Sequence, residues 1–477
     1  MRLLVWEKGV LMHPKAGPGN ATLLSVLAAL ALGACGVGEE PNTGSSGSQL
    51  QAQWTDFPAK SHRPTRDAVT GVTEKYFGGP IVPNPKVYVV WWGSAASINA
   101  NLTRTTGGIA DFFAGTLNTG YWDMLNEYST NINAQAGSHV GQAGTGQFLG
   151  RGNYARTIAM TNIPTGTHIT DAQIQAAINT NITSGVLPQP DDNTIYAIYF
   201  PSSVSIDLSG SRSCSAFGAY HEAVIRSPSH NAWYLVMPDC GYSFASWTNV
   251  SSHELVEAAT DAIPTPGSNP DYPQAWNDSS GNEIGDLCQS SSGTIATPKG
   301  SFTVQGQWDE RTQGCKITSF DANDFNVAFS TNTSSLTVGA ATNFAVTTAV
   351  SSGSAQSLTL SVVAPAGVTA SVSPASVTAG GSATVTVTAS AAVVDQQVVV
   401  QAQSPSGQVH TAALLINAGM APANDFAISA SPTSLSLQAG GTSGTSTIAT
   451  SIVAGSGTVA LAVSGAPSGV TATLSPT

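Results

Sequence analysis

The chain has 477 residues, enough for two to four domains of ordinary size. Only 9% of the residues are charged, and the chain is rich in Gly, Ser, Thr, Ala and Val, as is typical of β-rich extracellular proteins. The net charge of −12, with no cluster of Lys and Arg, excludes nucleic acid as an expected partner.

The N-terminus predicts export. A short apolar run ends at residues 32–35, Leu-Gly-Ala-Cys, so residues 1–35 are expected to be a signal peptide. The last four residues resemble the lipobox of bacterial lipoproteins, in which the cysteine is lipidated. We therefore expect a bacterial outer-membrane or cell-surface protein held by a lipid anchor at Cys35, or a secreted one. No other membrane contact is expected, and the start codon, Met1 or Met12, stays open.

Residues 36–65 have the composition of a linker, and residues 66–320 alternate predicted strands and helices. Continuous apolar runs predict buried strands at 86–93, 194–200 and 232–238. Helices are expected over 98–117 and over 171–182, the second capped by Thr170. This order predicts a mixed α/β domain, with its chemistry at strand ends and on the helix that follows the third strand.

Four cysteines remain after Cys35, all inside this segment. They are Cys214, Cys240, Cys288 and Cys315. An even number in an exported domain predicts two disulfides, and we prefer pairing in sequence order among three connectivities. A four-cysteine zinc site is the alternative, but no two cysteines are closely spaced.

The helix expected after the third strand carries residues 251–261, SSHELVEAATD, a stretch that concentrates acids and a histidine. Helical spacing places His253, Glu257 and Asp261 on one face, with Glu254 about 100° away. In zinc hydrolases, two residues four apart bind the metal and the glutamate after the first histidine handles a proton. Glu257 stands where such motifs usually have a second histidine.

Other residues could complete such a site. Glu283 and Asp286 lie in a Gly-rich and Ser-rich loop and are candidate metal ligands, while His221 is a candidate ligand or proton-handling group. The alternatives are solvated acids in a turn and a structural histidine. Residues 251–254 also fit a capping box, in which Glu254 only caps the helix.

The C-terminal third contains a repeat. ANDF occurs at 322–325 and 423–426, and APAGVTASVSP at 364–374 returns as APSGVTATLSP at 466–476. A period of roughly 100 residues with alternating strands predicts all-β immunoglobulin-like sandwiches at 323–418 and 424–477. The second copy is shorter, so we expect truncation relative to a longer parent.

Residues 80–317 resemble the exordium, or phosphate-induced protein, family of secreted proteins. The resemblance runs in order through VYVVWWG, ITDAQIQAAI, CSAFGAYHEA, PDCGYSF, SSHELVEAATD, EIGDLC and VQGQWDERTQGC. It places in shared motifs the residues His221, His253, Glu254, Glu257, Glu283 and Asp286. Asp261 is followed by Ala262 where the family usually has proline. The resemblance implies a role in growth and the extracellular matrix without defining an activity.

Three functions follow as hypotheses. The first is a metal-dependent, peptidase-like hydrolase, with zinc held by His253, Glu257 and Asp286 or Glu283, and with Glu254 and His221 as catalytic groups. The second is a non-catalytic module, stabilised by zinc or calcium, that binds envelope or extracellular polymer, with the sandwiches as spacers. The third, a serine hydrolase, lacks a Gly-x-Ser-x-Gly motif. The sequence predicts no oligomeric state.

Overall fold

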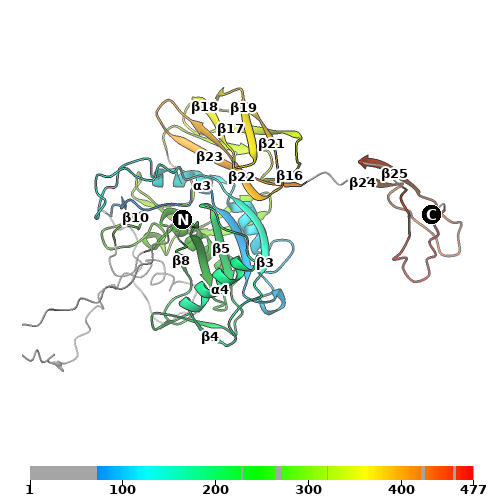
Figure 1. Ribbon diagram of the computed structural model, residues 1–477, viewed down its shortest axis with the longest axis horizontal. Coiled ribbons are helices and arrows are strands. Elements are labelled where there is room, and N and C mark those ends of the chain that lie inside the picture. The colour runs from blue at the N-terminus through cyan, green and yellow to red at the C-terminus, as the bar shows by residue number, and fades with distance from the viewer. Residues whose placement is uncertain are drawn as a thin grey trace, which may run out of the picture. The chain divides into compact units, whose positions relative to one another are not determined.

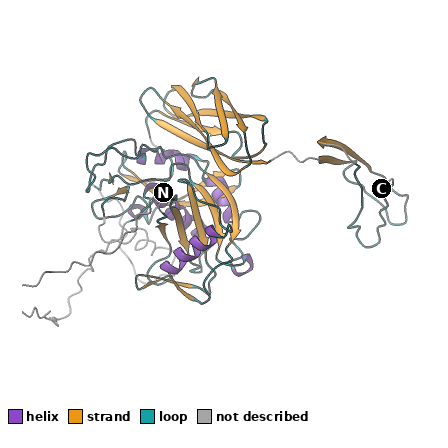
Figure 2. Ribbon diagram, viewed as in Figure 1, coloured by secondary structure: helices purple, strands orange, loops and turns teal. Residues whose placement is uncertain are grey.

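The computed structural model describes residues 72–226, 229–264, 270–319, 321–419, 425–454 and 458–475. The predicted signal peptide, Cys35 and the linker 36–65 lie outside these residues. Strands make up most of the regular structure (Figure 2). Within the described ranges, no helix is long and apolar enough to span a membrane.

A five-stranded mixed sheet forms the centre of the first domain (Figure 1). Its strand order is β3-β2-β5-β9-β8; β3, β2, β5 and β9 run parallel, and β8 is an antiparallel edge strand. The bounds are β2 Lys86–Trp91, β3 Asn153–Ala159, β5 Thr194–Tyr199, β8 Tyr220–Val224 and β9 Ala232–Met237. The three apolar runs predicted to be buried strands are thus β2, β5 and β9, and every residue in them is buried.

Helices cover both faces of this sheet. Alternate residues of β2 point to opposite faces, so Val89 joins one core and Val90 the other. The Val89 core contains α2 (Ile109–Thr116) and α5 (Phe244–Thr260). The Val90 core contains α4 (Asp171–Thr183), which Figure 1 shows against the sheet.

The two predicted helices have different outcomes. α4 begins where expected, and Thr170 forms a capping box with Gln173. The helix expected over 98–117 is shorter, because η1 (Ala95–Ser97) is followed by turns and α2 begins only at Ile109. Gly107 has φ +68° and Gly108 is the N-cap residue, so this glycine pair delays the helix.

Short elements surround the sheet. They are β1 (Lys75–Tyr76) paired with β10 (Trp276–Asn277), α3 (Gly120–Asp123), η2 (Met124–Tyr128), β4 (His168–Thr170) with β6 (Ser205–Leu208) and β7 (Ser211–Arg212), η3 (Asp286–Cys288), β11 (Ser292–Thr297) with β12 (Gly300–Gln305), and β13 (Gln307–Asp309) with β14 (Gly314–Lys316). Of these, β12 packs against α5, and its last residue donates a backbone hydrogen bond to Ser252 Oγ at 2.9 Å.

The next segment forms two sheets around a single apolar core. One has the order β15-β17-β21-β19, with bounds Asp324–Phe329, Ala341–Ser352, Ser382–Ala389 and Val368–Ser373. The other has the order β16-β23-β22-β18-β20, with bounds Thr333–Thr337, Val409–Gly419, Val393–Gln403, Ser357–Val363 and Ser376–Thr378. Polar and apolar residues alternate along β17 and β21, so one side of each strand faces the core.

The repeat in the sequence returns as a repeated strand pair. β24 (Asp425–Ser431) pairs antiparallel with β25 (Thr447–Ala454), as β15 pairs with β17. The start of β24 lies 425 − 324 = 101 residues after the start of β15, which matches the period found in the sequence.

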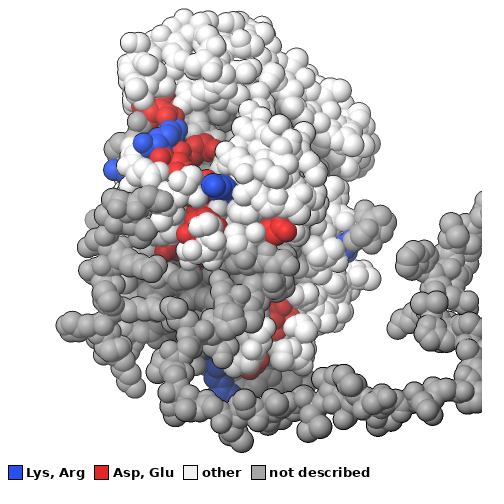
Figure 3. All heavy atoms as spheres, turned by 90° about the vertical axis from the view of Figure 1, so that its left-hand side faces the viewer, with Lys and Arg blue, Asp and Glu red and all other residues white. Residues whose placement is uncertain are grey.

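Polar contacts join the two-sheet segment 324–419 to the central sheet of the first domain. The Lys86 ammonium donates to the backbone carbonyl of Asp395 at 2.9 Å, and Arg156 pairs with the Asp395 carboxylate at 2.5 Å. Asn84 donates to Thr411 Oγ1 at 2.9 Å. Among the residues that Figure 3 colours, blue and red side chains lie next to one another at the upper left of the view.

Candidate metal centre

The acidic stretch lies in the middle and end of α5, and not at its start. The helix begins at Phe244, where the N-cap residue Ser243 accepts a hydrogen bond from the Ser246 backbone at 3.1 Å. The capping box considered for residues 251–254 is therefore wrong, because those residues already lie inside the helix. All helix residues from Trp247 to Thr260 are buried, so the acids among them do not form a solvated face.

His253, Glu257 and Asp286 form one group of candidate ligands. His253 Nε2 lies 3.1 Å from Glu257 Oε2 and 3.9 Å from Asp286 Oδ1. Atoms bound tetrahedrally to one zinc ion at about 2.1 Å lie about 3.4 Å apart, so these spacings fit a common ion. Glu257 Oε2 and Asp286 Oδ1 have no hydrogen-bond partner among the described residues.

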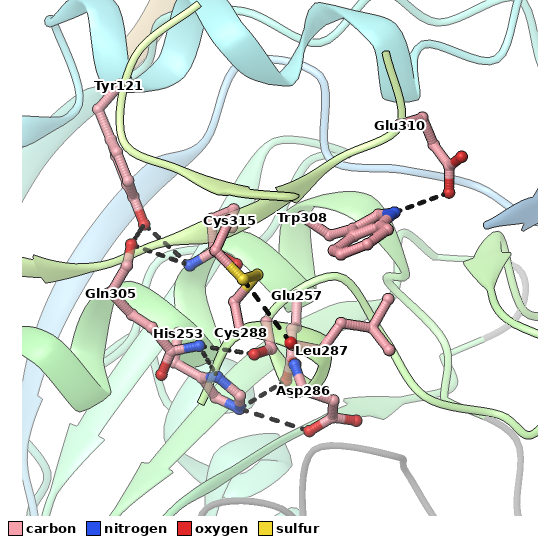
Figure 4. The surroundings of a disulfide bond; sticks show 12 residues. Tyr121, His253, Glu257, Asp286, Leu287, Cys288, Gln305, Trp308, Glu310 and Cys315 are labelled. Atoms are coloured by element: carbon pink, nitrogen blue, oxygen red, sulfur yellow. Dashed lines mark hydrogen bonds and ion pairs between the residues drawn. A yellow bond between two sulfur atoms is a disulfide. The ribbon is translucent and has the colours of Figure 1, made fainter. Parts of the chain in front are cut away.

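The loop that carries Asp286 is held close to α5. The Asp286 backbone N–H donates to Glu257 Oε1 at 3.0 Å, which leaves Oε2 of the same carboxylate facing the histidines. A Cβ atom on Gly285 would lie 2.6 Å from His253 Nδ1, so only glycine permits this approach. The Cys288–Cys315 disulfide ties the loop to β14 beside the centre (Figure 4).

Gln305 holds the other side of the His253 ring. Its Nε2 lies 2.7 Å from the Gly285 carbonyl oxygen, to which it donates, and 2.9 Å from His253 Nδ1 (Figure 4). In this arrangement Nδ1 accepts, so the proton of the neutral ring is on Nε2. Binding of an ion by Nε2 requires that proton to move to Nδ1, and Nδ1 could donate to Gln305 only if the amide turned and gave up its bond to the Gly285 carbonyl.

His221 and Glu254 form a second group with Glu257. His221 Nδ1 lies 3.7 Å from Glu254 Oε2 and 3.9 Å from Glu257 Oε2. His221 comes from the edge strand β8, so sheet and helix supply facing ligand atoms. Glu283 lies on the other side of the ring, 3.4 Å from His221 Nε2, and belongs to neither group.

Asp261 has a supporting position. It ends α5, and its two carboxylate oxygens accept from the Ala275 backbone at 2.8 Å and from Asn277 Nδ2 at 2.7 Å. Its backbone carbonyl lies 3.0 Å from His221 Nε2. Asp261 therefore positions the 274–277 segment and His221, although helical spacing had placed it with the candidate ligands.

Burial dominates the electrostatics of the centre. Desolvation lowers the pKa of both histidines to about 3, so the imidazoles are neutral. Desolvation raises the pKa of each of the carboxyl groups of Glu257, Glu283 and Asp286 well above the ordinary value for its residue type, and neighbouring acids add to the shift. A divalent cation would offset this cost, because it favours the ionised form of each carboxyl group.

The structure pairs the four cysteines in sequence order, as preferred from the sequence. The bonds are Cys214–Cys240 and Cys288–Cys315. Two disulfides in one domain are typical of proteins outside the cytosol. Sequence reasoning did not identify Gln305 or Gly285 as parts of the centre, because neither residue type is a typical ligand and Gln305 is far from α5 in sequence.

No family model matches the chain, and no curated protein matches it. Solved structures with partial similarity include domains 4 and 5 of the S-layer protein SbsC, at 18% identity and TM-score 0.17, covering 25% of this chain and 58% of that one. The secreted serine protease VesC from Vibrio cholerae has 13% identity and TM-score 0.16, covering 28% and 33%. A nucleoside hydrolase-related hypothetical protein from Saccharophagus degradans has 8% identity and TM-score 0.19, covering 70% and 100%. Scores this low support no argument about fold or function.

Proposed function

We propose that this chain is an exported metalloprotein whose exordium-like α/β domain, residues 66–320, holds a divalent cation. The observation that carries the proposal is the convergence of His253, Glu257 and Asp286, whose ligand atoms all lie within 4.8 Å of one another in a buried setting. Buried charges are normally paired or bound to metal. Residues 323–418 and 424–477 would form immunoglobulin-like sandwiches.

The chemistry proposed for this centre is hydrolysis of an amide or ester, most directly in a peptide. One nitrogen and two carboxylate ligands suit zinc, and zinc lowers the pKa of a bound water to about 7. Glu254 Oε1 lies 4.0 Å from His253 Nε2, so its carboxylate is beside the proposed ion. Glu254 would accept a proton from the attacking water and pass it to the leaving group.

A second candidate rests on the burial of the same residues. The side chains of His253, Glu254 and Glu257 have zero exposure, whereas catalytic zinc keeps a position open to substrate. A closed, mostly carboxylate site suits a structural ion, including calcium. The protein would then be a metal-stabilised module that binds envelope or extracellular polymer.

Metal content tests the shared part of both candidates. Full-length protein purified without chelators should contain at least one equivalent of a divalent metal by elemental analysis. His253→Ala should lose it, whereas His230→Ala should keep it, because the His230 side chain is 56% exposed and lies outside both ligand groups. If the protein contains no metal and gains no thermal stability from zinc or calcium, residues 251–261 are only part of a buried helix.

Turnover separates the two candidates. Metal-loaded protein should cleave casein or members of a peptide library, and Glu254→Gln should abolish cleavage while one equivalent of metal stays bound. If the loaded protein is stabilised by metal but cleaves nothing, the structural module is the correct function.

The two disulfides support export to an oxidising compartment, and we propose attachment through a lipid on Cys35. The full-length protein should partition into detergent, and Cys35→Ala should move it to the aqueous phase. Continued detergent partitioning of Cys35→Ala would contradict lipidation at this residue.

A further inference from the structure

The two groups of candidate ligands share one residue. Glu257 belongs both to the group with His253 and Asp286 and to the group with His221 and Glu254. The same atom, Oε2, lies 3.1 Å from His253 Nε2 and 3.9 Å from His221 Nδ1. It is buried and has no hydrogen-bond partner among the described residues.

Glu254 divides its two oxygens between the same histidines. Oε2 lies 3.7 Å from His221 Nδ1, and Oε1 lies 4.0 Å from His253 Nε2. A carboxylate that bridges two metal ions has the same arrangement, with one oxygen directed toward each ion. Two-metal sites place their ions about 3.5–4 Å apart, a separation that one carboxylate spans.

His221 already has the orientation of a metal ligand. Its Nε2 lies 3.0 Å from the Asp261 carbonyl oxygen, which can only accept, so Nε2 carries the proton. Nδ1 then directs a lone pair toward Glu254 and Glu257. Ligating histidines usually donate their second N–H to a carbonyl or carboxylate in this way.

Charge favours the same conclusion. Glu254, Glu257, Glu283 and Asp286 have fully buried or nearly fully buried side chains. One divalent cation would balance only two of these four carboxylates if all were ionised, whereas two would balance all four. Uncompensated buried charge is costly.

We infer that His221 Nδ1, Glu254 and Glu257 form a second divalent-cation site that shares Glu257 with the first. The inference rests on the metal site of the proposed function and adds to it. Occupation of the second site would engage the carboxylate of Glu254 and withdraw it from proton transfer. The second ion would therefore inhibit the hydrolysis proposed above.

The test counts ions in the full chain. After removal of metal with a chelator, titration with zinc should load two equivalents, and His221→Ala should load one. The matched control His230→Ala should load two. Manganese-loaded wild-type protein should show an exchange-coupled electron paramagnetic resonance signal, because a shared carboxylate couples the two ions.

The outcomes separate the two proposals. Absence of any bound zinc or calcium would overturn the proposed function and this inference together, whereas a single equivalent at saturation would overturn only the second site. Two equivalents that remain in a folded His221→Ala, or two uncoupled manganese ions, would also overturn it. The wild-type count decides even if His221→Ala does not fold, and His221→Gln provides a second variant of closer volume.

Discussion

Glu257→Gln should separate the cost of the buried charge from the benefit of the metal. Glutamine has nearly the same shape, and its oxygen can still accept from the Asp286 backbone, as Glu257 Oε1 does at 3.0 Å. At the position of Oε2 it places an amide group, which does not bind cations. The variant should therefore keep the fold and lose the metal.

The magnitude follows from burial and from mass action. Burial raises the pKa of Glu257 well above its ordinary value, so without metal its contribution to stability is present at acidic pH and is lost as pH rises. Metal-free Glu257→Gln should thus be at least as stable as the metal-free wild type at pH 7. Zinc at 100 times its Kd should stabilise the wild type by about 2.7 kcal/mol. This corresponds to a rise in Tm of roughly 5–11 °C for a domain of this size.

Thermal denaturation with chelator and with zinc measures both effects, and Glu127→Gln serves as a matched control because Glu127 pairs with Arg311 and belongs to neither ligand group. The control should keep the zinc-dependent rise, whereas Glu257→Gln should show none. A full zinc-dependent rise in Glu257→Gln would refute the role of this carboxylate.

Three further changes test the surroundings of the centre. Gly285→Ala places a Cβ atom 2.6 Å from His253 Nδ1, so it should weaken zinc binding in a titration and cost about 1–3 kcal/mol in denaturant unfolding; unchanged affinity would contradict the close approach. Replacing Cys288 and Cys315 together by serine opens a loop with a sequence separation of 27, which should cost about 3–4 kcal/mol; no loss in denaturant unfolding would show that the bond is dispensable. Burial raises the pKa of Glu127 to about 8, so its stabilising contribution disappears as pH rises through 8. Glu127→Gln should therefore lose about 1 kcal/mol less stability between pH 7 and pH 9 than the wild type, and identical pH profiles would contradict this shift.

The sequence predicted the parts of the fold that depend on local patterns. Apolar runs located β2, β5 and β9, and Thr170 marked the start of α4. The sequence predicts the helix that follows the third strand but leaves a cap at Ser251 open as an alternative, whereas Ser243 is the residue that caps α5. Local patterns do not decide which of two serines is the N-cap residue, because burial of the helix against the rest of the domain favours the longer helix.

The candidate centre was predicted only in part. Helical spacing brought His253 and Glu257 together, but it also grouped Asp261, whose carboxylate instead binds the 274–277 segment. The position of Gln305 depends on how β12 packs against α5, which sequence spacing does not encode. The same holds for His221, which reaches Glu254 from the edge strand β8.

The position of the ion tests the central claim most directly. Crystals of the full chain soaked in zinc and measured at the zinc absorption edge should show an anomalous peak within about 2.2 Å of Glu257 Oε2, with His253 and Asp286 as further ligands. An anomalous map without a peak at this place, with zinc bound only at surface residues, would contradict the metal centre.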